Sequence, residues 1–96
     1  MPKIQAIVMK PDDNVATVVE AVEAGLEVSV DIGGAKMIIT VIEPIPFGHK
    51  FALREIISGQ PVKKYGEIIG IATQDISMGQ HVHVHNLESC RGRGDK

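Results

Sequence analysis

Alternation of apolar with polar side chains is the feature that most constrains how this chain can fold. Residues 26–32 alternate large apolar residues with polar or small ones, and residues 81–87 alternate histidine with valine or asparagine. Successive side chains of a β-strand point to opposite faces, so both stretches are typical of half-buried strands. In the second stretch one face would carry the imidazoles of His81, His83 and His85. The valines and Leu87 would then help to build a core.

Turn-forming residues separate further strand-like segments. Gly, Pro, Asp and Asn recur along the chain and favour turns between short elements. Between these turns we expect extended segments at residues 4–9, 15–19, 36–41, 60–65 and 68–72. The valines of residues 15–22 also have helical spacing, with Asn14 as a possible N-cap. We favour the strand, which would form a hairpin with the first segment.

Helical structure is expected in one or two short places. Residues 51–57 predict a short helix that stops at Ser58-Gly59, and residues 75–79 predict a tight turn or a single helical turn. An apolar residue, a turn with glycine and the start of a strand recur at residues 22–28, 57–62 and 76–82. Such echoes are common where short strands and tight loops alternate, and they do not establish a repeat. The predicted fold class is mostly β with one or two short helices.

Length and composition exclude several classes of protein. The chain has 96 residues, which fits one small domain over residues 1–96. Hydrophobic residues make up 44% and aromatic residues 3%, so Ile, Val, Ala and Leu must fill the core. The net charge of −2 argues against nucleic acid, and no apolar run approaches the roughly 20 residues of a membrane span. The single cysteine, Cys90, and the lack of a signal-peptide pattern predict a soluble cytoplasmic protein.

Three longer motifs occur together and in order: residues 46–53 (PFGHKFAL), 64–70 (KYGEIIG) and 79–87 (GQHVHVHNL). Together they closely resemble the SAF-type domain at the N-terminus of altronate and galactarate dehydratases, and residues 11–16 match that domain's early signature. The resemblance implies a small β-rich fold, the β-clip. In this family the domain either precedes a large catalytic domain or forms a separate small subunit. A related small subunit belongs to sulfolactate sulfo-lyase.

The resemblance also implies a chemistry and a partner. The chain would be the small subunit of a sugar-acid hydro-lyase, completing an active site with a separate large catalytic subunit that eliminates water from a hexonate or hexarate. The family is associated with divalent iron or manganese, which the large subunit would mainly hold, and a homo-oligomer is also compatible. A base must remove the proton next to the carboxylate, and the doubly charged intermediate needs a metal ion or fixed cationic donors.

The histidines are the catalytic and metal-binding candidates. Imidazole transfers protons and binds metals near neutral pH, which makes His49, His83 and His85 the catalytic candidates. His83 and His85 are also the candidate metal ligands. Within the row, His83 and His85 match the family signature, and we expect His81 to be peripheral. The alternative is that the histidines are solvated residues of an edge strand, or that one is a core histidine bonded to backbone.

Three further residues are substrate-binding candidates. Lys50 offers a point positive charge for a sugar-acid carboxylate, Tyr65 offers a hydroxyl, and Asn86 completes the family signature. Tyr65 could equally be an anchor with its hydroxyl at the surface. Two functional alternatives stay open: the small subunit of sulfolactate sulfo-lyase, and a non-catalytic carbohydrate-binding or assembly module. No motif in the chain distinguishes between the substrates.

Overall fold

The computed structural model describes residues 4–8, 13–32 and 34–89, and these residues form strands and loops without a helix. The strands, in chain order, are β1 (Ile4–Ile7), β2 (Val15–Val18), β3 (Glu27–Ile32), β4 (Ala35–Thr40), β5 (Lys50–Ala52), β6 (Pro61–Lys64), β7 (Glu67–Ala72), β8 (His81–Val82) and β9 (Leu87–Ser89). The mostly β prediction is confirmed. Cys90 and residues 9–12 lie outside the described residues. Among the residues described, no helix is long and apolar enough to cross a membrane.

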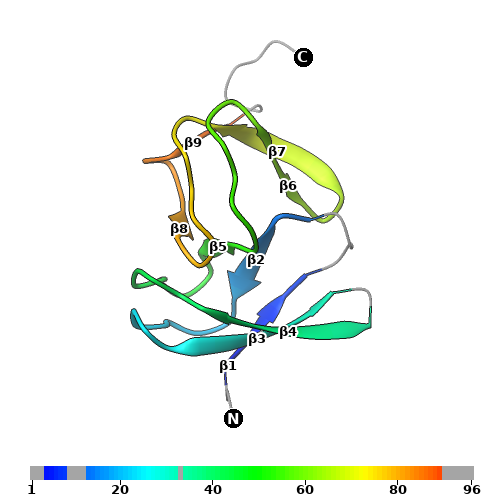
Figure 1. The fold of residues 1–96 in the computed structure, drawn as a ribbon, viewed down its shortest axis with the longest axis vertical. Coiled ribbons are helices and arrows are strands. Elements are labelled where there is room, and N and C mark those ends of the chain that lie inside the picture. Colours follow the sequence, from blue (N-terminus) through cyan, green and yellow to red (C-terminus); the bar gives the residue numbers. More distant parts are fainter. Residues whose placement is uncertain (1–3, 9–12, 33, 90–96) are drawn as a thin grey trace.

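The described strands form two sheets. One has six strands in the order β4-β3-β1-β2-β5-β8, and the other has three in the order β6-β7-β9. Neighbouring strands are antiparallel except for β1 and β3, and the predicted hairpin of β1 with β2 is confirmed. Figure 1 shows the three-stranded sheet at one end of the long axis and β3 with β4 at the other. Strands β2 and β5 lie between them.

The two central strands serve two hydrophobic cores at once. In β2, Val15 packs into one core while Ala16 and Val18 pack into the other. In β5, Ala52 packs into the same core as Val15, and Phe51 packs into the other core. Because successive side chains of a strand point to opposite faces, each of these strands is buried on both sides. The two sheets are therefore held together by a shared middle layer.

Four loops among the described residues share one conformation: residues 22–26, 45–49, 56–60 and 76–80. Each begins with a buried residue in an isolated bridge, and the bridges pair Val22 with Ile45 and Ile56 with Ile76. The fourth residue of each loop is a glycine with φ between 81° and 93°, a left-handed conformation that favours glycine. Its N–H donates, at 2.8 to 3.2 Å, to a carbonyl four residues before the partner loop begins. The echo in the sequence is therefore a structural repeat.

The predicted helix over residues 51–57 is wrong. Phe51 and Ala52 belong to β5, which pairs with β2 on one side and β8 on the other. Ile56 bonds to Ile76 through both backbone groups, at 2.7 and 2.8 Å. These backbone groups are therefore bonded to distant segments rather than to the next turn of a helix, and tertiary pairing overrides the local propensity.

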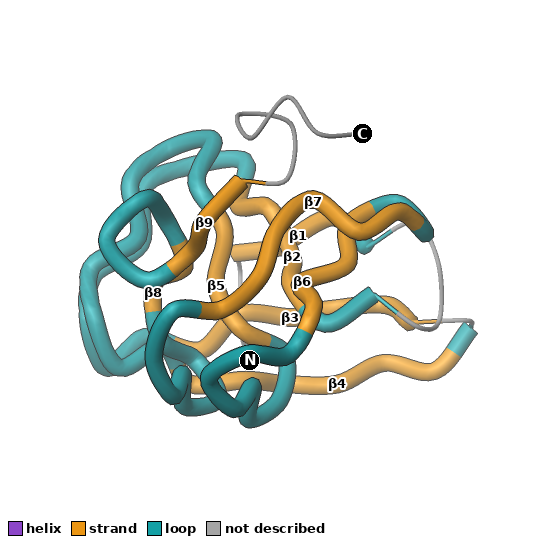
Figure 2. Tube along the Cα trace, turned by 90° about the horizontal axis from the view of Figure 1, so that it is seen from above, coloured by secondary structure: helices purple, strands orange, loops and turns teal. Residues whose placement is uncertain are grey.

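The predicted strand over residues 81–87 is confirmed only at its ends. Strand β8 stops at Val82, a turn covers residues 83–86, and β9 starts at Leu87. The N–H of Asn86 donates to the carbonyl of His83 at 3.0 Å and closes this turn. The three histidines of the row do not share one face of a single strand. Figure 2 shows the loops gathered largely on the side of the molecule where β8 lies.

Candidate active site

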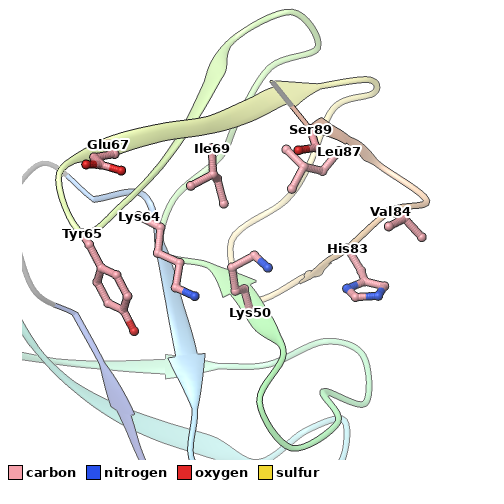
Figure 3. A pocket seen from close by; sticks show the side chains of 9 residues that line it. All are labelled: Lys50, Lys64, Tyr65, Glu67, Ile69, His83, Val84, Leu87 and Ser89. Carbon is pink, nitrogen blue, oxygen red and sulfur yellow. The ribbon is translucent and has the colours of Figure 1, made fainter. Parts of the chain in front are cut away.

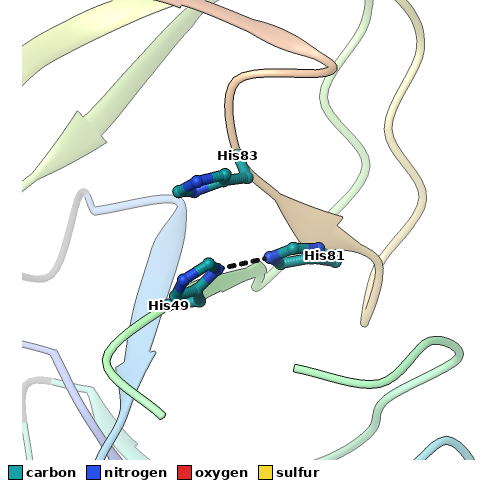
Figure 4. Close-up of side chains that lie close together, drawn as sticks. All are labelled: His49, His81 and His83. Atoms are coloured by element: carbon teal, nitrogen blue, oxygen red, sulfur yellow. Dashed lines mark hydrogen bonds between the residues drawn. The ribbon is translucent and has the colours of Figure 1, made fainter. Parts of the chain in front are cut away.

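Three imidazole rings meet at the β8 edge of the six-stranded sheet. His49 directly precedes β5 and His81 begins β8, and the pairing of these two strands brings them together. The ring centroids of His49 and His83 are 4.2 Å apart, and those of His49 and His81 are 5.1 Å apart. Nδ1 of His49 lies 2.9 Å from Nε2 of His81 in a hydrogen bond (Figure 4). We call His49, His81 and His83 the imidazole cluster.

A second set of polar groups adjoins this cluster through His81. The centroid of the His85 ring lies 5.3 Å from that of His81, and His85 is exposed. The backbone N–H of His81 donates to Oε1 of Glu43 at 3.0 Å. Donor atoms of Glu43, His81 and His85 lie within 4.8 Å of one another. His81 is thus the residue that links the cluster to a carboxylate.

The surroundings favour the neutral form of two rings in the cluster. Burial, followed by the neighbouring His49, His85 and His83, lowers the pKa of His81 below 6.5 against the opposing effect of Glu43. Partial burial and the charges of His49, Lys50 and His85 lower the pKa of His83 in the same direction. At neutral pH both rings therefore keep a lone pair, which can accept a proton or bind a cation.

Asn86 holds the backbone that carries the cluster. Its side chain is fully buried, Oδ1 accepts the N–H of His83 at 3.0 Å, and Nδ2 donates to the carbonyl of His81 at 2.8 Å. Both ends of the amide are therefore bonded within the chain. This placement makes Asn86 a positioning residue for the turn, whereas the sequence motif led us to expect a substrate ligand.

A cleft of about 410 Å³ opens beside the cluster, between the two sheets. Its lining residues are Lys50, Lys64, Tyr65, Glu67, Ile69, His83, Val84, Leu87 and Ser89. Figure 3 shows the amino groups of Lys50 and Lys64 reaching into the same space, with His83 and Tyr65 on opposite sides of the view. Burial and the charge of Lys64 lower the pKa of Lys50 from 10.5. An anion bound between these two ammonium groups would stabilise them, because their positive charges repel each other.

The Tyr65 side of the cleft is held by Asp13. This buried carboxylate accepts the backbone N–H of Tyr65 at 2.9 Å and that of Gly66 at 2.8 Å. The two bonds support a turn in which Tyr65 has a φ of 57°, rare for a residue with a side chain. The amino group of Lys64 lies 4.8 Å from the centre of the Tyr65 ring. Asp13 thus fixes a cleft wall from 52 residues away in the sequence.

The structure brings most of the sequence candidates to one region. His49 and His83 lie in the cluster, Lys50 and Tyr65 line the cleft, and His85 lies at the margin. His81, which we expected to be peripheral, is central. Sequence reasoning also missed Glu43, Lys64 and Asp13. The available signal for Lys64 and Asp13 was their place inside the motifs that carry the family resemblance.

The cluster fits a divalent transition metal by donor type. Ligand atoms of His49, His81 and His83 lie within 4.8 Å of one another, and all three residues are partly buried. Imidazole nitrogen suits iron and zinc, whereas manganese prefers oxygen ligands. The expected ligand pair of His83 and His85 is not the grouping that the geometry brings closest, because His85 groups with Glu43 and His81 instead.

The chain is similar in sequence to known enzymes and enzyme subunits. The family model of the altronate/galactarate dehydratase SAF domain matches residues 4–90. The chain is 44% identical over 77 residues to altronate dehydratase of Escherichia coli, covering 80% of this chain and 15% of that protein. It is 40% identical over 91 residues to (2R)-sulfolactate sulfo-lyase subunit alpha of Chromohalobacter salexigens, covering 92% of this chain and 97% of that protein. Its identity to the same-named subunit of Paracoccus pantotrophus is 43% over 53 residues, 55% of this chain and 79% of that protein.

Fold and site together define a small β domain in which histidine and lysine side chains gather beside a cleft between two sheets. The chain belongs to the altronate/galactarate dehydratase SAF domain family. The family resemblance of the three motifs is thereby confirmed, and so is the β-clip type of fold. The chain spans about one seventh of the length of the Escherichia coli altronate dehydratase that it matches.

Proposed function

We propose that this chain is the small subunit of a sugar-acid hydro-lyase of the altronate dehydratase kind, which completes its active site with a separate large catalytic subunit. The observation that carries the proposal is that His83 belongs to the imidazole cluster and also lines the cleft with Lys50 and Lys64. Proton-transfer groups and carboxylate-binding groups thus adjoin. These are the two requirements of an elimination next to a carboxylate.

The proposed reaction removes a proton from the carbon next to the carboxylate. The electron pair of that C–H bond enters the carboxylate, and its return expels the β-hydroxyl, which takes up a proton and leaves as water. His83 faces the cleft, and His49 stacks on it, so these two rings are the groups placed to move protons, with His85 at the margin. A divalent iron or manganese ion, held mainly by the large subunit, would supply further stabilisation of the developing negative charge.

The lysines supply the charge that a sugar acid requires. Lys50 and Lys64 face one space in the cleft, and a bound carboxylate would offset the burial and the Lys64 charge that together lower the pKa of Lys50. Tyr65 offers a hydroxyl from the opposite wall for a substrate hydroxyl. Substrate binding is therefore assigned to Lys50, Lys64 and Tyr65, and positioning to Asn86.

Sulfolactate sulfo-lyase is the second candidate function. The observation that favours it is that the chain covers 97% of the length of one sulfolactate sulfo-lyase subunit alpha. The elimination has the same form, with sulfite leaving in place of water. The lysine pair would suit a carboxylate in either substrate, so the residues of this chain do not separate the two reactions.

Co-purification from the native source, followed by elimination assays, tests the proposal. We expect a large partner subunit to co-purify and the complex to turn over altronate or galactarate, while the 96-residue chain alone shows no turnover. Sulfite release from sulfolactate without sugar-acid turnover would establish the second candidate. His83→Gln should lower kcat of the complex at least 100-fold. Unchanged turnover in that variant would leave the chain a docking or assembly module.

A further inference from the structure

We infer that this chain itself binds one divalent transition-metal ion through the imidazole cluster, with His49, His81 and His83 as its three protein ligands. The ligand atoms of these residues all lie within 4.8 Å of one another. In a tetrahedral site with metal–nitrogen bonds of about 2.0–2.1 Å, nitrogens lie about 3.3–3.4 Å apart. The nitrogens must therefore move from their present spacing to this one, and the stacked rings must rotate, for three nitrogens to surround one ion.

The hydrogen bond inside the cluster marks the point where the ligands converge. Nδ1 of His49 and Nε2 of His81 lie 2.9 Å apart, so the lone pair of one ring is aimed at a proton on the other. A cation that replaces this proton meets both nitrogens. The ring of His83 stacks on that of His49, with an interplanar angle of 19° and its centroid 4.2 Å away, and supplies the third donor.

The backbone around the cluster is fixed before any ion binds. The buried amide of Asn86 bonds to the N–H of His83 and to the carbonyl of His81. Glu43 accepts the N–H of His81, and the neighbouring Val82 is fully buried. Such outer contacts hold metal ligands in place and reduce the conformational entropy that binding would otherwise remove. Three ligands leave a coordination position open, which is typical of catalytic metal sites.

The rival set is Glu43, His81 and His85, which shares one ligand with the cluster. We favour the cluster because its three residues are all partly buried, whereas His85 is exposed. In addition, Oε1 of Glu43 already accepts the backbone N–H of His81. The inference does not rest on the proposed function, since metal binding can be measured without substrate or partner.

Titration of the tag-free 96-residue chain with Co²⁺ tests the site. We expect one ion per chain, with the visible absorption of a nitrogen-rich four-coordinate site. Each of His49→Ala, His81→Ala and His83→Ala should weaken binding at least tenfold. The control Glu43→Gln keeps an oxygen for the N–H of His81 and loses only the carboxylate charge, so it should weaken Co²⁺ binding less than each of the three alanine variants does. A loss in Glu43→Gln as large as that in His49→Ala, or no binding by the native chain, would overturn the inference.

A measurement on the native chain covers the case in which a histidine variant fails to fold. Two-bond ¹H–¹⁵N correlation spectra resolve the ring nitrogens of each histidine before and after addition of Zn²⁺. We expect large ¹⁵N shifts for one nitrogen in each of His49, His81 and His83, and none in His85. Shifts confined to His81 and His85 would assign the ion to the rival set and contradict the cluster site.

Discussion

At the scale of single residues, Asn86 shows how one buried side chain organises groups at the surface. The amide forms hydrogen bonds to backbone groups of His81 and His83, where the chain leaves β8 and enters the turn of residues 83–86. Without it, these partly buried backbone groups would be unpaired within the chain, at a cost of up to about 1–3 kcal/mol each. The geometry of the imidazole cluster therefore depends on a residue that has no exposed surface.

We predict that Asn86→Ala lowers the free energy of unfolding by about 2–4 kcal/mol, because two hydrogen bonds are lost and their partly buried partners are left without a protein acceptor or donor. Urea denaturation followed by circular dichroism measures the change. The matched control is Gln74→Ala. It removes a hydrogen bond from the side-chain amide to the carbonyl of His85 in the same turn, but at an exposed position. Its cost should stay within about 0.5 kcal/mol. Equal costs for the two variants would contradict the positioning role.

The lowered pKa values of His81 and His83 predict how stability depends on pH. Below pH 6.5 the unfolded chain binds protons at these rings more readily than the folded chain, so protonation stabilises the unfolded state relative to the folded state. The free energy of unfolding should therefore be highest above pH 6.5 and should fall as the pH drops through the folded-state pKa values. Unfolding measured at pH 8 and pH 5 should show a smaller loss in His81→Gln than in the native chain. A loss of the same size would exclude His81 as a contributor.

At the scale of the elements, the repeated loop gives the fold its plan. Each loop pairs with its partner loop through two backbone hydrogen bonds, and its glycine N–H donates to a carbonyl just before the partner loop. The four loops therefore form two hydrogen-bonded pairs. The pair of residues 56–60 and 76–80 leads into β6 and β8, which border the cleft and the cluster respectively. Gly79, in the loop of residues 76–80, has the least space around it among the four loop glycines.

We predict that Gly79→Ala destabilises the fold far more than Gly59→Ala. Both glycines have positive φ, 84° and 93°, so alanine at either costs about 1–2 kcal/mol of backbone strain. A Cβ at residue 79 would also overlap the carbonyl of Thr40, whereas one at residue 59 meets nothing within 4 Å. Gly79→Ala should therefore lose more than about 3 kcal/mol in the free energy of unfolding. Thermal melts of both variants check the order, and similar melting temperatures would refute it.

Several strands could be predicted from sequence because their signal is local. Residues 26–32 alternate in hydrophobicity, and β3 (Glu27–Ile32) follows that pattern closely. The helix at residues 51–57 failed because Phe51 and Ala52 pair with two other strands, and no local pattern encodes distant pairing. His81 was missed for a similar reason, since its nearness to His49 depends on the register of β5 with β8. The motifs named the right region, but they could not assign the roles within it.

At the scale of the whole molecule, the candidate site lies at the β8 edge of the six-stranded sheet, and the chain that leaves β4 returns to it, since the N–H of Ile42 donates to the carbonyl of Gly79 at 2.9 Å. Strand β8 carries the cluster, β4 lies at the opposite edge, and four strands separate them. The cleft joins the two sheets, because Lys50 comes from β5 whereas Lys64 comes from β6. Exposed apolar side chains adjoin the histidines in the chain: Phe47 is 72% exposed and Val84 is 81% exposed. In the proposed complex these side chains would be covered by the large subunit.

We predict that the double variant Phe47→Ser, Val84→Ser weakens association with the large subunit at least tenfold. Burying a large apolar side chain contributes about 1.5–3 kcal/mol, and about 1.4 kcal/mol corresponds to a factor of ten in affinity. The melting temperature of the variant chain should hardly change, because both side chains are exposed. Isothermal titration of the large subunit with each chain measures the effect. The matched control Ile38→Ser alters a 56% exposed residue of β4, the other edge strand of the sheet, and should keep native affinity. Loss of binding in Ile38→Ser but not in the double variant would place the partner on the β4 edge instead.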